Sequence, residues 1–368
     1  MLLTILAFIA ILLALVLVHE WGHFFAARRL GIGVEEFGFG FPPRAACLVR
    51  GGVRYSLNWL PLGGFVRLKG EQGGNTDPDS FGAQSAWCRA VVLLAGVSMN
   101  VVLAFLLLTI GFASGVPSVV EDADLAVARD VFVQVTDVAP GSPAAAAGIV
   151  VGDRVLQLDS QRISTTSDVQ DYVRQHAGVP VAVTVGKHGE QRTISVTPQV
   201  LAESNGRAVM GVSLLRTGLI RYPWYQAAWR AAGATLRLTW EIIRAFGLLV
   251  YNLVVQRQVP ADLAGPVGIA VLTGEVVSLG WTYILQFAAL LSLNLAIINV
   301  LPFPALDGGR LLFVAIEKLR GSPVDSRTEA LVHNIGFTFL MLLVLAVTYH
   351  DFAQLGGSLW GGISRFTW

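Results

Sequence analysis

Charged residues are scarce in this sequence. They make up 14% of the 368 residues, against 54% for hydrophobic residues, and the formal net charge at pH 7 is +1. This composition excludes an ordinary soluble globular protein, and the near-neutral balance gives no reason to expect a nucleic-acid partner. Long apolar runs instead predict a multi-pass protein of the lipid bilayer that carries some soluble mass.

Cysteine is also rare, and only Cys47 and Cys88 occur. The topology derived below places both on the cytoplasmic side, where thiols stay reduced, so we expect no structural disulfide. The apolar run from Leu2 to Val18 has no basic segment before it and no small-residue cleavage site after it. We therefore expect a retained membrane helix with its amino end outside the cytoplasm.

An HExxH pentapeptide, from His19 through Glu20 to His23, ends this apolar run. In a helix the two histidines lie at i and i+4 on one face, where both imidazoles can bind one Zn²⁺. Glu20 would then act as the general base on a water at the open position of the metal. A chance HExxH on the polar face of a soluble helix is the alternative. It is disfavoured because ionisable side chains near the hydrocarbon region are costly without a partner such as a metal.

The third zinc ligand must come from elsewhere in the chain. Asp307 follows Pro302 and Pro304, two prolines too close together to continue a regular helix. A carboxylate beside irregular backbone in the membrane needs a partner, so we expect Asp307 to be that ligand. Its alternative role is to cap the helix that begins at Gly308.

Apolar length and the Lys and Arg content of the loops predict about four transmembrane helices. We expect these spans at 1–30, 90–115, 282–301 and 331–350. The basic region between the first two spans, and the region 302–330 that holds Asp307, then lie in the cytoplasm, and both termini lie outside it.

One apolar segment, 220–258, is interrupted by charged residues at helical spacing. Arg230, Arg237, Glu241 and Arg244 share one helical face, which predicts an amphipathic helix along the outer membrane surface. A full span at this place would reverse the topology of everything downstream.

Two regions predict β structure. In 31–89, glycines interleave with aromatic residues, which favours β-hairpins that dip into the membrane over an ordinary cytoplasmic loop. An extended peptide can add as a strand to the edge formed by Phe65, Val66, Arg67 and Leu68. The region 119–200 has the composition of a soluble domain. Its segment Pro140–Gly148, followed by Gly152 and Asp153, resembles the PDZ domains of bacterial envelope proteases.

These motifs in this order resemble the intramembrane site-2 metalloproteases, and among them the bacterial RseP-like group. The resemblance rests on the HExxH motif, on Asn294 and Asn299 ahead of Pro302–Gly309, and on the PDZ-like region between the second and third spans. It implies a membrane α-helical fold with a membrane-associated β-hairpin and an extracytoplasmic PDZ-like α+β domain. One departure is visible, because the chain has room for a single PDZ-like domain where the group's namesake has two.

The resemblance implies a zinc-dependent enzyme of regulated intramembrane proteolysis in the bacterial inner membrane, acting in a stress response. His19, His23 and Asp307 would hold one Zn²⁺, and Glu20 would be catalytic. The partner would be a single-pass transmembrane protein, such as an anti-sigma factor already cut by an upstream protease, or a leftover signal peptide. The residues that would contact the unwound substrate are Asn294, Asn299, Pro302, Pro304, Phe65, Val66, Arg67 and Leu68.

Two alternatives stay open. The first is a related intramembrane protease that matures a signal or pheromone peptide. The second is a non-catalytic membrane scaffold that binds envelope proteins through the PDZ-like domain. A transporter is disfavoured because the sequence has no internal repeat with polar residues in both halves.

Overall fold

A computed structural model of the chain describes residues 2–71, 77–119, 128–187, 190–200, 208–256, 265–322 and 324–363. The chain forms two compact units. The first, which we call the helical unit, contains residues 1–111 and 227–368, and the second, the sheet unit, contains residues 112–226.

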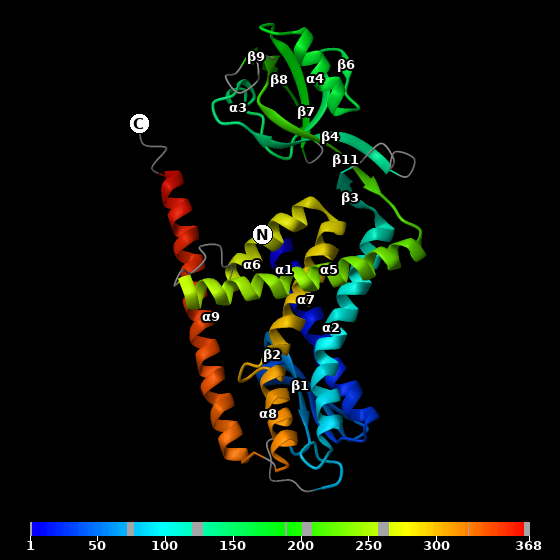
Figure 1. Cartoon of the computed structure of the whole chain (residues 1–368), viewed down its shortest axis with the longest axis vertical. Coiled ribbons are helices and arrows are strands. Elements are labelled where there is room, and N and C mark those ends of the chain that lie inside the picture. The colour runs from blue at the N-terminus through cyan, green and yellow to red at the C-terminus, as the bar shows by residue number, and fades with distance from the viewer. Residues whose placement is uncertain are drawn as a thin grey trace. The chain divides into compact units, whose positions relative to one another are not determined.

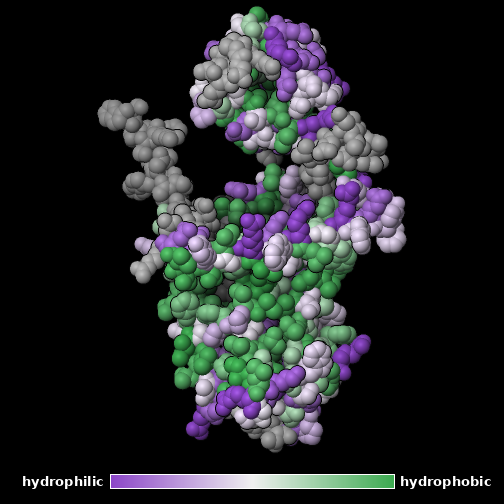
Figure 2. All heavy atoms as spheres, in the orientation of Figure 1, coloured by the Kyte–Doolittle hydropathy of each residue, from purple (hydrophilic) through white to green (hydrophobic). Residues whose placement is uncertain are grey.

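The helical unit is built from long apolar helices. Their bounds are α1 (Leu2–Arg29), α2 (Ala86–Ser114), α5 (Trp224–Tyr251, continued by a π-helical turn at Asn252–Gln256), α6 (Pro266–Leu279), α7 (Trp281–Val300), α8 (Asp307–Arg320) and α9 (Ser326–Ile363). Figure 2 shows a band of hydrophobic side chains across the visible face of this unit, with hydrophilic residues gathered at both rims of the band. Such a band is the surface that a lipid bilayer requires.

Within the described residues, five helices are long and apolar enough to cross a membrane, namely α1, α2, α5 with its π-helical turn, α7 and α9. The integral membrane character that the composition predicted is thereby confirmed, whereas the predicted count was about four. The additional candidate is α5, the segment predicted to lie along the membrane surface. In Figure 1, α5 runs across α2, α7 and α9, which are aligned with one another.

A β-hairpin lies between α1 and α2 in the sequence. β1 (Val34–Arg50) and β2 (Val53–Leu68) pair along two different stretches, because both strands bend back. The segment 34–39 therefore lies between 53–58 and 64–68, and Phe37 faces both Tyr55 and Val66. The edges of this small sheet are the segments 44–50 and 64–68. The glycine and aromatic pattern predicted such a hairpin here.

A shared core joins the hairpin to three helices. It contains the buried residues Ala26, Ala27, Ile32, Val34, Val53, Leu68, Phe81, Val92, Leu93 and Val314. These side chains come from α1, β1, β2, α2 and α8 and from the loops beside them. The carboxyl end of α1 and the amino half of α8 are therefore held by one packed cluster, although they are almost 300 residues apart in the chain.

The sheet unit is an α+β domain. Its main sheet has the strand order β3 (Val116–Val119), β11 (Val212–Ile220), β4 (Ala128–Val138), β5 (Arg154–Leu158), β7 (Val181–Lys187) and β8 (Glu190–Val196), with β6 (Gln161–Arg162) paired to β5. A second pair joins β9 (Gln199–Val200) to β10 (Ala208–Val209), and the helices are α3 (Pro143–Ala146) and α4 (Thr166–Gln175). The sheet extends past the bounds 119–200 predicted for this domain, because β3 begins at Val116 and β11, which pairs with β3 and β4, ends at Ile220.

Candidate metal centre

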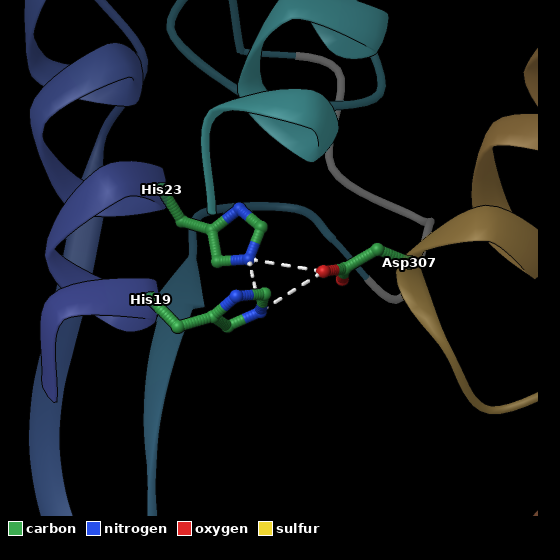
Figure 3. A group of neighbouring side chains, drawn as sticks. All are labelled: His19, His23 and Asp307. Carbon is green, nitrogen blue, oxygen red and sulfur yellow. Dashed lines mark hydrogen bonds and ion pairs between the residues drawn. The ribbon is translucent and has the colours of Figure 1, made fainter. Parts of the chain in front are cut away.

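Three side chains from two helices point toward one another in the helical unit (Figure 3). His19 and His23 lie one turn apart near the carboxyl end of α1, and Asp307 is the first residue of α8. Both histidines are buried, with 6% and 7% of their surface exposed. Asp307 does not cap α8, because the N-cap position is Leu306 and no side-chain cap bond is present. The alternative role weighed for Asp307 is therefore not the one the structure shows.

The three ligand atoms form a nearly equilateral triangle. His19 Nε2 lies 3.2 Å from His23 Nε2, and Asp307 Oδ2 lies 3.1 Å and 3.2 Å from these two nitrogens. A tetrahedral zinc ion with bonds of about 2.0 to 2.1 Å separates its ligand atoms by about 3.3 Å. Asp307 Oδ2 is buried and has no hydrogen-bond partner among the described residues. The separations and this unsatisfied oxygen both fit a zinc ion.

Close packing of two helices fixes both histidines. A Cβ added at Gly96 on α2 would collide with the His23 imidazole and would lie 2.9 Å from Cε1 of His19. A Cβ added at Gly22 on α1 would lie 2.5 Å from the carbonyl oxygen of Ala95. Only glycine at these two positions lets α1 and α2 approach this closely, as small residues do in membrane helix pairs.

Each histidine has a second hydrogen bond that orients its ring. His23 Nδ1 lies 2.8 Å from the carbonyl oxygen of Val92 and donates to it, which leaves the lone pair of Nε2 free for a metal. His19 Nδ1 lies 3.3 Å from the side-chain amide of Asn100, a fully buried residue of α2. With the amide turned so that Oδ1 accepts from Nδ1, this otherwise unpartnered oxygen is satisfied and His19 Nε2 is also free.

Sequence reasoning missed Asn100. It lies inside a segment that was read only as an apolar span, yet a polar side chain within such a span is itself a signal of function. Ser292 of α7 donates a hydrogen bond of 2.8 Å to the Asn100 carbonyl oxygen, so a third helix supports this position.

Glu20 lies beside the edge of the hairpin. Its carboxylate accepts a hydrogen bond from the backbone N–H of Val66. A Cβ added at Gly64 would lie 3.3 Å from Cγ of Glu20, so the edge segment 64–68 packs directly against α1. The predicted base and part of the predicted substrate edge are thus neighbours.

The other predicted substrate contacts fall into two groups. Asn299 of α7 lies close to the centre, with Nδ2 3.5 Å from His19 Nε2. The amide of Asn294 instead donates to the Leu290 carbonyl oxygen of its own helix. Leu68 is 6% exposed and belongs to the hydrophobic core, so its side chain is not available to a substrate. Arg67 lies 3.7 Å from the buried carboxylate of Glu36. Pro302 and Pro304 form part of the turn before Asp307.

Comparison with known proteins matches residues 7–343 of this chain to Peptidase family M50. The chain belongs to peptidase family M50. Zinc metalloprotease RasP of Geobacillus kaustophilus is 31% identical, and the alignment covers 95% of this chain and 97% of the relative. A putative zinc metalloprotease of Brucella suis is 30% identical over 95% of this chain and 94% of its own length. A putative zinc metalloprotease of Clostridium perfringens is 34% identical, and the alignment covers 92% of this chain and 95% of the relative.

Family membership confirms the predicted enzyme class. This M50 peptidase is a zinc metalloprotease of the site-2 type, as the HExxH motif and Asp307 indicated. The PDZ domain of an SdrC-like protein of Listeria monocytogenes matches 23% of this chain and 86% of its own length at 19% identity, with a TM-score of 0.21.

Proposed function

We propose that this M50 peptidase performs regulated intramembrane proteolysis, cutting a single-pass membrane protein within its membrane helix. The observation that carries the proposal is the position of the metal triad. His19 and Asp307 meet between apolar helices of the helical unit, which carries the band of hydrophobic side chains. A strand edge lies beside Glu20. A protease for soluble substrates has no need to bury its ligands among membrane helices.

Glu20 is the residue placed to move protons. When bound, zinc supplies a Lewis acid that activates water and polarises the scissile carbonyl. Glu20, next to His19 in the chain, takes a proton from the attacking water and delivers it to the departing amide nitrogen. The hydrogen bond from Val66 N–H holds the Glu20 carboxylate in place between these two transfers.

The edge segment 64–68 gives the substrate a place to unwind. A helical substrate keeps its amides in i to i−4 hydrogen bonds, so its peptide carbonyl is not accessible until these bonds open. Val66 N–H points out of the sheet and is bonded to Glu20, so a substrate strand at this edge would run past the base and would bond to the edge groups that Glu20 does not occupy. Asn299, close to His19, is placed to donate to a displaced substrate carbonyl.

We place the enzyme in the bacterial inner membrane with the metal centre toward the cytoplasmic side. In this topology α1, α2, α7 and α9 span the bilayer, and both termini are extracytoplasmic. α5 lies along the outer surface, which its crossing orientation in Figure 1 supports. Trp229 and Trp240 of α5 are 82% and 67% exposed, as expected of aromatic side chains in the interfacial belt.

The sheet unit is proposed to be a PDZ-like domain on the extracytoplasmic side that binds a peptide as an added strand. The segment that resembles a PDZ domain in the sequence, Pro140–Asp153, is held by the contacts of its last residue. Asp153 is fully buried, lies 2.7 Å from Arg192 and accepts a hydrogen bond of 3.0 Å from Val150 N–H. A trimmed end left by an upstream protease is the peptide that such a domain would receive.

The test is cleavage of a single-pass substrate by the purified full chain in detergent. We expect Glu20→Gln to lose about 10²- to 10⁴-fold in rate while binding as much zinc as the wild type, since Glu20 acts as a base and not as a ligand. Glu35→Gln, the same change at an exposed glutamate, is the matched control.

Full activity of Glu20→Gln would overturn the proposed role of Glu20. A wild type that cuts only free signal peptides, and no anchored single-pass protein, would favour signal-peptide or pheromone maturation as the function.

A further inference from the structure

The turn that carries Asp307 has a strained backbone. It joins α7 to α8, and Ala305 within it has a φ of 76°, in the left-handed region that side chains with a Cβ rarely adopt. A segment in this conformation persists only where its surroundings hold it. The position of the Asp307 carboxylate, two residues later, depends on this turn.

One face of α9 packs on the turn. His333 Nδ1 accepts a hydrogen bond of 2.8 Å from the backbone N–H of Ala305. Three residues further along α9, a Cβ added at Gly336 would collide with Pro304 and would lie 2.8 Å from the Pro304 carbonyl oxygen. The ring centroids of Phe339 and Phe303 lie 5.9 Å apart. Residues three apart lie on the same face of a helix, so α9 meets the turn with one continuous surface.

We propose that His333 is a positioning residue for the metal ligand Asp307. It accepts the Ala305 N–H, keeps the turn in its left-handed form and thereby holds the Asp307 carboxylate against the two histidines. This inference rests on the metal triad of the proposed function. His333 does not touch the triad, and it acts only through the backbone of the turn.

The tautomer of His333 is set by this contact. Nδ1 can accept only if it carries no proton, so the proton of the neutral ring is on Nε2. Nε2 is buried without a hydrogen-bond partner among the described residues, and the nearest carboxylate oxygen, of Glu329, lies 3.9 Å away.

The rest of α8 is held independently of His333. Arg310 forms an ion pair with Glu71, just beyond the hairpin, and Glu317 lies 2.6 Å from Arg89 of α2. Loss of the His333 bond is therefore expected to loosen the turn while α8 stays in place. Loss of this bond should therefore lower zinc affinity more than it lowers the stability of the fold.

The experiment measures zinc affinity of the purified full chain in detergent by competition with a chelator. His333→Leu removes the acceptor, and His333→Asn places an amide oxygen close to where Nδ1 lies. We expect His333→Leu to bind zinc roughly tenfold more weakly, and His333→Asn to stay near the wild type. Asn334→Leu, at an exposed position on the same helix, is the control. If His333→Leu fails to fold, His333→Ala takes its place.

Unchanged zinc affinity in His333→Leu, or an equal loss in His333→Asn, would overturn the inference. Asp307→Ala separates this failure from that of the proposed function, because a triad that does not bind zinc through Asp307 would leave this variant at wild-type affinity. Glycine adopts the left-handed conformation freely, so Ala305→Gly should reduce the penalty of His333→Leu. A penalty that is unchanged in the Ala305→Gly background contradicts the role of the turn.

Discussion

Two carboxylates with buried oxygen atoms, one in each unit, have opposite surroundings. Asp153 in the sheet unit is fully buried, but Arg192 lies 2.7 Å away and neutralises its charge. Asp307 in the helical unit is paired, among the described residues, with His19 and His23 alone. Neutral imidazoles cannot balance a buried negative charge. The arginine makes the first carboxylate a structural element, whereas the surroundings of the second fit its proposed role as a zinc ligand.

The largest effect is expected from Asp307→Ala. This change removes one of the three ligands, so zinc affinity should fall by more than the roughly 10- to 100-fold that loss of an outer hydrogen bond causes. Cleavage should be lost with it, while the thermal unfolding of the metal-free protein changes little. Zinc content after dialysis and chelator competition measure the effect. Wild-type zinc content in this variant would remove Asp307 from the triad.

The matching change in the sheet unit, Asp153→Asn, should act on stability alone. It removes the charge that pairs with Arg192 and weakens the bond to Val150 N–H, and we expect about 1 to 3 kcal/mol less stability for this unit. Faster amide exchange in β5 and β7 of the full chain would report it. Zinc affinity is expected to be unchanged, and a loss of zinc here would contradict the separation of the two roles.

A smaller effect is expected from Asn100→Leu, which changes only the bond behind His19. The ring of His19 loses its partner at Nδ1, so zinc affinity should fall roughly 10- to 100-fold with no change in the ligand set. Ser98→Leu, an exposed site on the same helix, is the control. Equal affinities of Asn100→Leu and the control would show that Asn100 does not orient His19.

The smallest effect is expected at the amino end of α4. Thr165 and Asp168 form a capping box, and Thr165→Ala should cost about 1 kcal/mol of stability in the sheet unit. Hydrogen bonds from Ser164 and Thr165 hold the pKa of Asp168 below its usual value, although partial burial acts in the opposite direction. The stabilisation is therefore present above an unfolded pKa of about 3.9 and is lost as the pH falls. Amide exchange in α4 as a function of pH measures it, and no loss at low pH would contradict the capping box.

Local sequence patterns were sufficient to predict the residues of the candidate metal centre. His19 and His23 are four residues apart, and helical periodicity alone places them on one face. Asp307 was recognisable because it follows Pro302 and Pro304 within a few residues, at the end of an apolar span. The residues Phe65 to Leu68 were expected at a strand edge because glycines interleave with aromatic residues in this region. These features depend on neighbours in the chain, where spacing and conformation are tightly linked.

Residues that act across long loops could not be found in this way. Asn100 is 81 residues from His19, and Ala305 meets His333 only because α9 folds back on the turn. Leu68 was expected to contact substrate, but the packing of α1, α2 and α8 places it in the core. No periodicity in the sequence indicates which of two alternate strand faces such a core will bury.

The sequence by itself determined a membrane protein with an HExxH zinc site, because hydropathy and helical spacing are local properties of the chain. Only the tertiary structure decided which polar groups support that site, how α5 runs across the other helices, and how far the sheet unit extends. The physical reason is that buried polar groups must find partners wherever packing brings them. The partners of His19 and Glu20 come from α2 and the hairpin, and the turn before Asp307 is bonded to α9. The fold alone brings these elements together.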